Sequence, residues 1–247
     1  MRRRSIKEGD ILPSKLCGDF VIKEYVDSEN IIIEFIQTGY KTSARLPHVV
    51  RGNVKDKMLP DLCGVGYIGD GIYKSSSEQG RSWSYMLQRC YYYDREMYTT
   101  YKDCTVCNEW HNLQTFGKWY DETHPADGIK YQLDKDLKVI GNRVYSPDTC
   151  IWLPAKLNGF FVRALNPDSG IQQVRGKYRV RVSNYSLGGS AWTHLGYFED
   201  KYSAVSAYVS AKREILLKLK SMFPQIGGVV FDNMDTLLNN KLHIKEV

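Results

Sequence analysis

The segment from Gln132 to Asn158 constrains this chain more than any other part of its sequence. Within it, two aspartates flank Lys135, a Gly-Asn pair marks a turn, and Asn158 follows an apolar run. This order predicts a strand, a loop and a short helix that gather oxygen-bearing side chains. Such side chains bind hard divalent cations, so the segment favours a metal site that acts on phosphates.

The composition is that of a globular protein with a basic surplus. The chain has 247 residues, with 34 lysines and arginines against 28 aspartates and glutamates, and a net charge of +6. Its length is compatible with one to three domains. The surplus is compatible with a polyanionic partner, but many basic proteins bind no nucleic acid. The positions of the charges must therefore carry the argument.

The lack of an apolar export or membrane segment leads us to expect a reducing compartment, which bears on the cysteines. No apolar run approaches the ~20 residues of a membrane span, and the first residues lack the apolar segment of a secretory signal. We therefore expect no membrane partner, a cytoplasmic location and six cysteine thiols. Cys104 and Cys107, with His111, invite a structural zinc site, but the usual second ligand pair is missing. We expect buried thiols and no zinc.

Changes of pattern along the chain predict three parts in an α+β fold. Residues 1–70 alternate β-rich runs with turns, which predicts an N-terminal β-rich domain. Residues 71–165 contain a helical stripe and then the Gln132–Asn158 segment. Residues 166–247 alternate as strands and then change to a helical period, which predicts a three-stranded sheet followed by a helix.

The last part carries basic residues at every second position. From Arg175 to Arg181 each odd-numbered residue is a cation, so one strand face is basic and the other, with Val180 and Val182, is apolar. Arginine reads guanine edges, and both arginine and lysine contact phosphate. A solvated basic strand is the alternative. The residues predicted to contact DNA are Arg175, Lys177, Arg179, Arg181, Trp192 and Thr193.

Several short motifs occur in order along the chain. They are Trp83-Ser-Tyr-Met-Leu-Gln-Arg-Cys90, Leu133-Asp-Lys-Asp136, Tyr145-Ser-Pro-Asp-Thr-Cys-Ile-Trp152, Gly176-Lys-Tyr-Arg-Val180, Leu195-Gly-Tyr-Phe198 and Ala204-Val-Ser-Ala-Tyr208. The series resembles the phage-borne HNH homing endonucleases, in the branch that carries a DNA-binding domain of the ethylene-response-factor (Apetala-two) type. In that type of domain, a three-stranded sheet lies in the DNA major groove and a helix packs behind it.

The resemblance implies an HNH-like ββα-metal core. Asp134 matches the acid that ligates Mg²⁺ or Mn²⁺, and Asn158 matches the helix ligand. Lys135 stands at the histidine position and Thr149 at that of the middle asparagine. A protonated lysine cannot act as a base, so water activation falls to Asp136 or to the metal, and Lys135 could stabilise charge on a phosphate. The predicted catalytic residues are Asp134, Lys135 and Asp136, and the predicted metal ligands are Asp134 and Asn158.

The first hypothesis is a metal-dependent endonuclease that hydrolyses double-stranded DNA, with the last part of the chain supplying affinity. The second is a DNA-binding or regulatory phage protein in which residues 134–136 form a salt-bridged strand end of an inactive nuclease core. The third is a protein-binding host-takeover factor that reuses the same fold.

Overall fold

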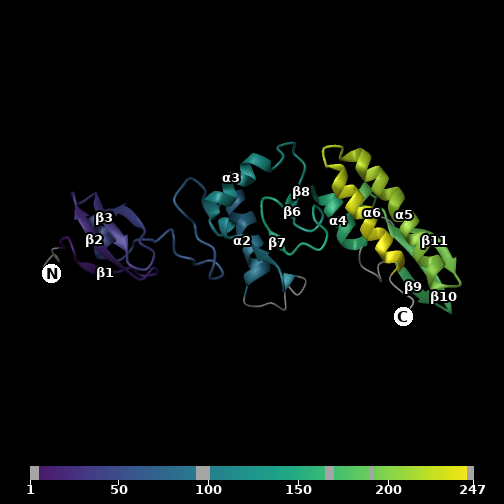
Figure 1. Cartoon of the computed structure of the whole chain (residues 1–247), viewed down its shortest axis with the longest axis horizontal. Coiled ribbons are helices and arrows are strands. Elements are labelled where there is room, and N and C mark those ends of the chain that lie inside the picture. Colours follow the sequence, from purple (N-terminus) through teal and green to yellow (C-terminus); the bar gives the residue numbers. More distant parts are fainter. Residues whose placement is uncertain (1–5, 93–100, 165–169, 190–191, 244–247) are drawn as a thin grey trace. The chain divides into compact units, whose positions relative to one another are not determined.

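A computed structural model describes residues 6–92, 101–164, 170–189 and 192–243 of this protein (Figure 1). The fold is mixed α+β, as predicted, with several small sheets and six α-helices in these described ranges. The chain forms two compact units, Met1–Glu122 and Thr123–Val247. None of the described helices is long and apolar enough to cross a membrane.

The N-terminal unit begins with a four-stranded antiparallel sheet. Its elements are β1 (Ile11–Pro13), β2 (Asp19–Tyr25), β3 (Ile31–Phe35) and β4 (Lys41–Ala44), paired in that order and followed by α1 (Leu46–Val50). In β3 the alternation of side chains buries Ile31, Ile33 and Phe35 against Phe20 and Ile22 of β2. This apolar face closes a small core, as the β-rich pattern predicts.

Helices complete the N-terminal unit. The elements are α2 (Glu78–Tyr91), β5 (Thr105–Val106), the 3-10 helix η2 (Asn108–His111) and α3 (Leu113–Thr123). Ser77 caps α2, because its side chain accepts a hydrogen bond from the Gly80 amide at 3.1 Å. The predicted helical stripe of α2 is buried, and Trp83 donates a hydrogen bond from its indole to the Trp110 carbonyl at 2.7 Å.

The C-terminal unit starts with a strand, a loop that includes a two-residue strand, a further strand and a helix. The elements are β6 (Tyr131–Asp134), β7 (Val144–Tyr145), β8 (Ile151–Pro154) and α4 (Ala155–Ala164). β6 pairs antiparallel with β8, so that Asp134 lies opposite Ile151. α4 follows β8 directly, and the sequence of β6, β8 and α4 is a ββα unit.

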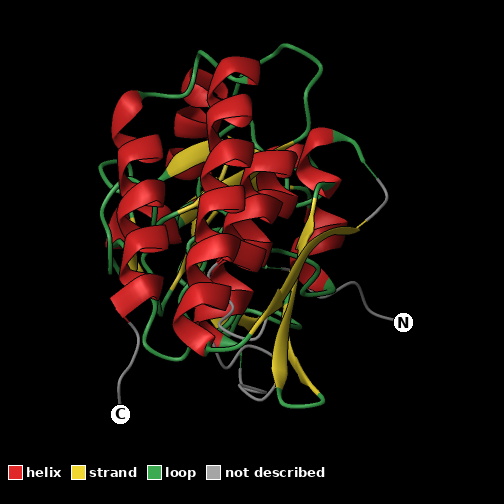
Figure 2. Ribbon diagram, turned by 90° about the vertical axis from the view of Figure 1, so that its right-hand side faces the viewer, coloured by secondary structure: helices red, strands yellow, loops and turns green. Residues whose placement is uncertain are grey.

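A three-stranded sheet and two helices complete this unit. The elements are β9 (Ile171–Val174), β10 (Lys177–Ser183), the 3-10 helix η3 (Tyr185–Leu187), β11 (Trp192–Phe198), α5 (Lys201–Met222) and α6 (Gly228–His243). The sheet is antiparallel in the order β11-β10-β9. Asp200 caps α5, and α5 packs against α6, the helix that leads to the C-terminus in Figures 1 and 2.

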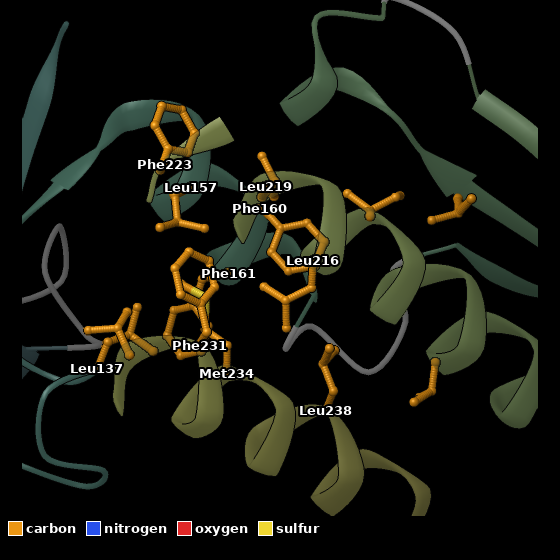
Figure 3. Packing of buried hydrophobic residues seen from close by; sticks show 14 of the residues in the cluster. Leu137, Leu157, Phe160, Phe161, Leu216, Leu219, Phe223, Phe231, Met234 and Leu238 are labelled. Carbon is orange, nitrogen blue, oxygen red and sulfur yellow. The ribbon is translucent and has the colours of Figure 1, made fainter. Parts of the chain in front are cut away.

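One apolar core joins the ββα unit to α5, α6 and the three-stranded sheet. Figure 3 shows Leu157 and Phe160 of α4 facing Leu219 of α5 and Phe231 of α6, and Leu137 from the loop after β6 packs into the same cluster. Val180 and Val182 of β10 also belong to it. Burial of these apolar side chains is the main stabilising contribution in the unit.

Candidate functional site

The β9–β10 connection is a two-residue turn at Arg175 and Gly176. Val174 pairs with Lys177, and the φ angles of 49° at Arg175 and 82° at Gly176 are both in the left-handed region. This is the pattern of a type I′ hairpin, whose twist matches that of the flanking strands. Arg175 therefore lies at the tip of the hairpin and not on the strand.

One face of the C-terminal sheet is basic and aromatic. Val180 and Val182 of β10 are buried with Ala204 and Tyr208 of α5, so α5 covers their side of the sheet. Strand alternation and register place the other side chains on the opposite side. We define this side as the open face, which comprises Gln172, Val174, Lys177, Arg179, Arg181, Ser183, Trp192, His194 and Tyr197.

Side chains on the open face contact one another across strands. Gln172 Oε1 accepts hydrogen bonds from the guanidinium groups of Arg179 and, at 3.4 Å, of Arg181. The Arg181 guanidinium lies 5.5 Å from the ring centroid of Trp192, which is 52% exposed. The rings of His194 and Tyr197 lie 5.2 Å apart. The face thus combines held cations with exposed aromatic rings.

A β-bulge decides which β11 side chains reach the open face. The register shifts between Val180, which pairs with Gly196, and Arg181, which pairs with His194. The bulge adds one residue to β11, and it brings Trp192 to the open face while Thr193, opposite Val182, lies on the α5 side.

The structure therefore brings together four of the six residues predicted to contact DNA: Lys177, Arg179, Arg181 and Trp192. Sequence reasoning did not single out Gln172, His194 and Tyr197. Tyr197 lies in the Leu195-Gly-Tyr-Phe198 motif, which was a signal for it, but the cross-strand partners of Gln172 and His194 depend on register.

The net positive charge of the chain comes from the C-terminal unit, because this unit has fewer acidic residues. Residues 123–247 carry 17 lysines and arginines against 11 aspartates and glutamates, whereas residues 1–122 carry 17 of each kind. The unit that holds the open face therefore accounts for the whole net charge of +6. The electrostatic attraction on a polyanion would therefore come from this unit.

Asp134 ends β6 and organises the turn after it. Its Oδ1 accepts hydrogen bonds from the backbone amides of Asp136 at 2.9 Å and Leu137 at 2.8 Å. Burial raises the pKa of the Asp134 carboxyl above its ordinary value, and the hydrogen bond from the Leu137 amide opposes this shift. The side chain is therefore both a turn cap and a partly buried acid.

Lys135 points to the interior. Its side chain is 4% exposed, its Nζ lies 2.5 Å from Asp136 Oδ1, and the ammonium lies 5.6 Å from the ring centroid of Tyr145. The alternation of β6 continues past its end, so Lys135 faces the side of Leu133 while Asp134 faces the other side. The ammonium is engaged within the unit, in contact with a carboxylate and an aromatic ring.

Asn158 on α4 reaches back to β6. Its Nδ2 donates a hydrogen bond to Gln132 Oε1 at 2.6 Å. Gln132 precedes Asp134 by two residues and so lies on the same face of the strand. The two predicted metal ligands thus belong to one side of the ββα unit, and Gln132, which sequence reasoning missed, connects their elements.

Thr149 and Asn142 hold the loop between β6 and β8. Thr149 Oγ1 donates to the Val144 carbonyl at 2.7 Å. Asn142 Nδ2 donates to the carbonyls of Lys135 at 2.8 Å and Val144 at 2.7 Å. Both side chains therefore act on the backbone of the loop, which fixes its path between the strands.

Other metal-ligating residues do not gather in the described part of the chain. No group of three or more His, Cys, Asp or Glu side chains is arranged there to hold a metal ion. Cys104 is buried, and burial raises the pKa of the nearby Cys107 thiol to about 11. The absence of structural zinc stays a prediction.

Chemically, the open face presents guanidinium and ammonium donors beside exposed aromatic rings, and the ββα unit offers carboxylate and amide oxygens on one side. Neither a protein-family model, nor a curated protein, nor a solved structure matches this chain.

Proposed function

We propose that this protein binds double-stranded DNA through the open face of its C-terminal sheet. The observation that carries this proposal is the cluster of Arg179, Arg181 and Trp192 on a sheet side that α5 does not cover. The major groove admits a two-stranded β-ribbon, and the β9–β10 hairpin, which carries Arg179 and Arg181, is such a ribbon within the three-stranded sheet. There, guanidinium groups bond base edges and phosphates.

The hairpin tip extends the same surface. Arg175 and Lys177 line a hollow of about 460 Å³ beside Tyr197. Lys177 also forms an exposed ion pair with Glu199 at 2.5 Å, and exposed pairs of this kind contribute little stability. Lys177 can therefore exchange Glu199 for a phosphate at small cost.

Salt-dependent binding tests the proposal. We would measure duplex affinity by fluorescence anisotropy over a range of salt concentrations, for the wild type and an Arg179→Ala/Arg181→Ala variant. We expect at least about tenfold weaker binding by the variant. Its salt slope should be smaller by about 0.9 for each phosphate that the protein no longer neutralises.

The matched control is Lys201→Ala/Lys218→Ala, which removes two exposed cations of α5 from the same unit. It should leave the affinity nearly unchanged. An Arg179→Ala/Arg181→Ala variant that binds as the wild type does would place the interface elsewhere.

Metal-dependent cleavage of DNA is a second candidate function. The observation in its favour is that Asp134 and Asn158 share one side of the ββα unit. Their donor oxygens fit Mg²⁺ or Mn²⁺, which commonly bind one or two carboxylates and complete their shell with water and phosphate. A bound cation would lower the pKa of its water and polarise the phosphoryl oxygen.

In this second candidate the residues of the chain have separate tasks. Asp134 and Asn158 would hold the cation, and Gln132 would orient the Asn158 amide. The ion pair of Lys135 and Asp136 would support the turn beneath them, without touching the phosphate.

Nicking of a supercoiled plasmid in Mg²⁺ or Mn²⁺ tests this candidate. We would compare the wild type with Asp134→Asn, which keeps an oxygen acceptor for the two turn amides, and with Asp148→Asn, an exposed carboxylate of the same loop. Loss of nicking only in Asp134→Asn supports the site. Nicking that persists in Asp134→Asn refutes it, and a wild type without nicking leaves DNA binding as the function.

A further inference from the structure

We propose that Gln172 is a positioning residue that holds Arg179 and Arg181 as one unit and thereby sets the base-sequence specificity of the open face. This inference rests on the proposed DNA binding and adds the means by which the face distinguishes one sequence from another. The observation behind it is a single amide oxygen that accepts from two guanidinium groups.

The position of Gln172 makes this contact possible. Gln172 lies on β9, an edge strand of the sheet, directly opposite Arg179 of the central strand β10. Arg181 is two residues further along β10, on the same face. One acceptor on the edge strand therefore meets both arginines, and Trp192 covers Arg181 from β11.

These contacts restrict the rotamers of the two arginine side chains before DNA binds. A free arginine side chain has many rotamers, and ordering it on binding weakens the complex. Each guanidinium carries five N–H groups. The Nε of Arg179 is buried, so the hydrogen bond to Gln172 leaves the other terminal N–H groups of the two side chains for DNA. Gln172 thus orients the two forks without using up their hydrogen-bonding capacity.

The chemistry of the amide matters as well. A carboxylate at this position would also accept from both arginines, but it would cancel part of the positive charge that attracts phosphate. A neutral amide positions the cations and leaves the charge of the face intact. Gln172 therefore affects geometry rather than electrostatic attraction.

The short distance between the two guanidinium groups indicates which base pairs they would contact. Because both guanidinium groups converge on one oxygen atom, they lie close together. Stacked base pairs are about 3.4 Å apart, and arginine pairs bidentately with the O6 and N7 atoms of guanine. We therefore expect the preferred site to contain guanines at neighbouring base pairs.

The experiment begins with selection of preferred duplexes from a random pool by the wild-type chain. We would then measure the ratio of affinities for the selected duplex and a scrambled duplex, together with the salt slope and the melting temperature. The variants are Gln172→Ala, Gln172→Glu and the matched control Gln173→Ala. Gln173 is an exposed glutamine next in the chain, but it pairs with Tyr178 and faces the other side.

Gln172→Ala should lower the specificity ratio about tenfold, with the salt slope unchanged because the charge of the face stays the same. Gln173→Ala should keep the ratio of the wild type. Gln172→Glu should bind both duplexes more weakly but recover most of the ratio, because the acceptor is restored. An unchanged melting temperature shows that the variants fold.

Three results would overturn the inference, and they are distinguishable. A wild type that binds no DNA contradicts the proposed function and the role of Gln172 together. A wild type that binds DNA without preference for the selected duplex contradicts only the specificity of the pair. A Gln172→Ala variant with the wild-type ratio contradicts the positioning role alone.

Discussion

The ammonium of Lys135 lies 2.5 Å from Asp136 Oδ1, so that a buried cation is paired with a carboxylate that is 45% exposed. Neighbours in the chain rarely face each other along a strand, but here the turn after β6 brings them together, because Asp134 binds the amides of Asp136 and Leu137. A lysine in this place is part of the interior of the ββα unit. Its ammonium contacts the carboxylate that the turn supplies.

Removing the carboxylate of this pair should destabilise the C-terminal unit. We expect Asp136→Asn to lower the free energy of unfolding by about 1–2 kcal/mol, because a buried ammonium loses a charged hydrogen-bond partner. Lys135→Met should cost less, since no buried charge then remains. Urea unfolding followed by circular dichroism measures both. The control is Asp148→Asn, and equal midpoints for Asp136→Asn and the wild type would contradict the prediction.

The exposed indole of the open face should contribute to binding and not to stability. Trp192→Ala should weaken duplex binding about threefold to tenfold, because Arg181 loses its cation–π partner and the face loses an aromatic ring. The melting temperature should stay within about 1–2 °C, as the ring is 52% exposed. Tyr185→Ala, which removes another exposed ring outside the open face, should leave the affinity unchanged.

The Cys107 thiol should be unreactive near neutral pH. Its pKa is raised by burial from an ordinary value of 9.0 to about 11, and only the thiolate is alkylated. Labelling of the folded protein with iodoacetamide, followed by mass spectrometry, should show a rate that rises about tenfold per pH unit from pH 8 to pH 10. A plateau near pH 9 would show an unperturbed thiol.

The same shift affects stability at alkaline pH. The folded state holds the Cys107 proton more tightly than the unfolded state does. The resulting contribution to the free energy of unfolding is therefore fully present below pH 9 and is lost as the pH rises through about 11. Cys107→Ser should remove that part of the pH dependence.

Shortening the Leu219 side chain should destabilise the core between α4, α5 and α6. This residue is fully buried, so Leu219→Ala should lower the free energy of unfolding by about 2–4 kcal/mol. Leu217, two residues earlier on α5, is 66% exposed. Leu217→Ala should change stability by less than about 0.5 kcal/mol, and an equal loss in both variants would contradict the assigned packing.

Local patterns predicted much of this structure. The alternation from Lys177 to Val182 correctly separates a basic face from an apolar one, since Val180 and Val182 are buried. The helical stripe around Trp83 is also buried, and Asp200 caps the predicted helix. These features depend on neighbours within a few residues, which is the range over which strand and helix periods act.

Other features escaped prediction because distant residues decide them. The helix α6 was not predicted, and its apolar side chain Phe231 is buried against α4 and α5 (Figure 3). The bulge in β11 decides that Trp192, and not Thr193, shares the face of Arg181. Neither the packing of a helix nor the register of a strand follows from its own residues alone.

The sequence by itself determined the alternation of the strands, the caps and stripes of the helices, and the surplus of charge in residues 123–247. Only the tertiary structure decided that Gln172 meets two arginines, that Asn158 reaches Gln132, and that Lys135 is buried. The physical reason is one of range. A residue's face follows from the backbone period around it, whereas its contacts follow from the register and packing of elements far away in the chain.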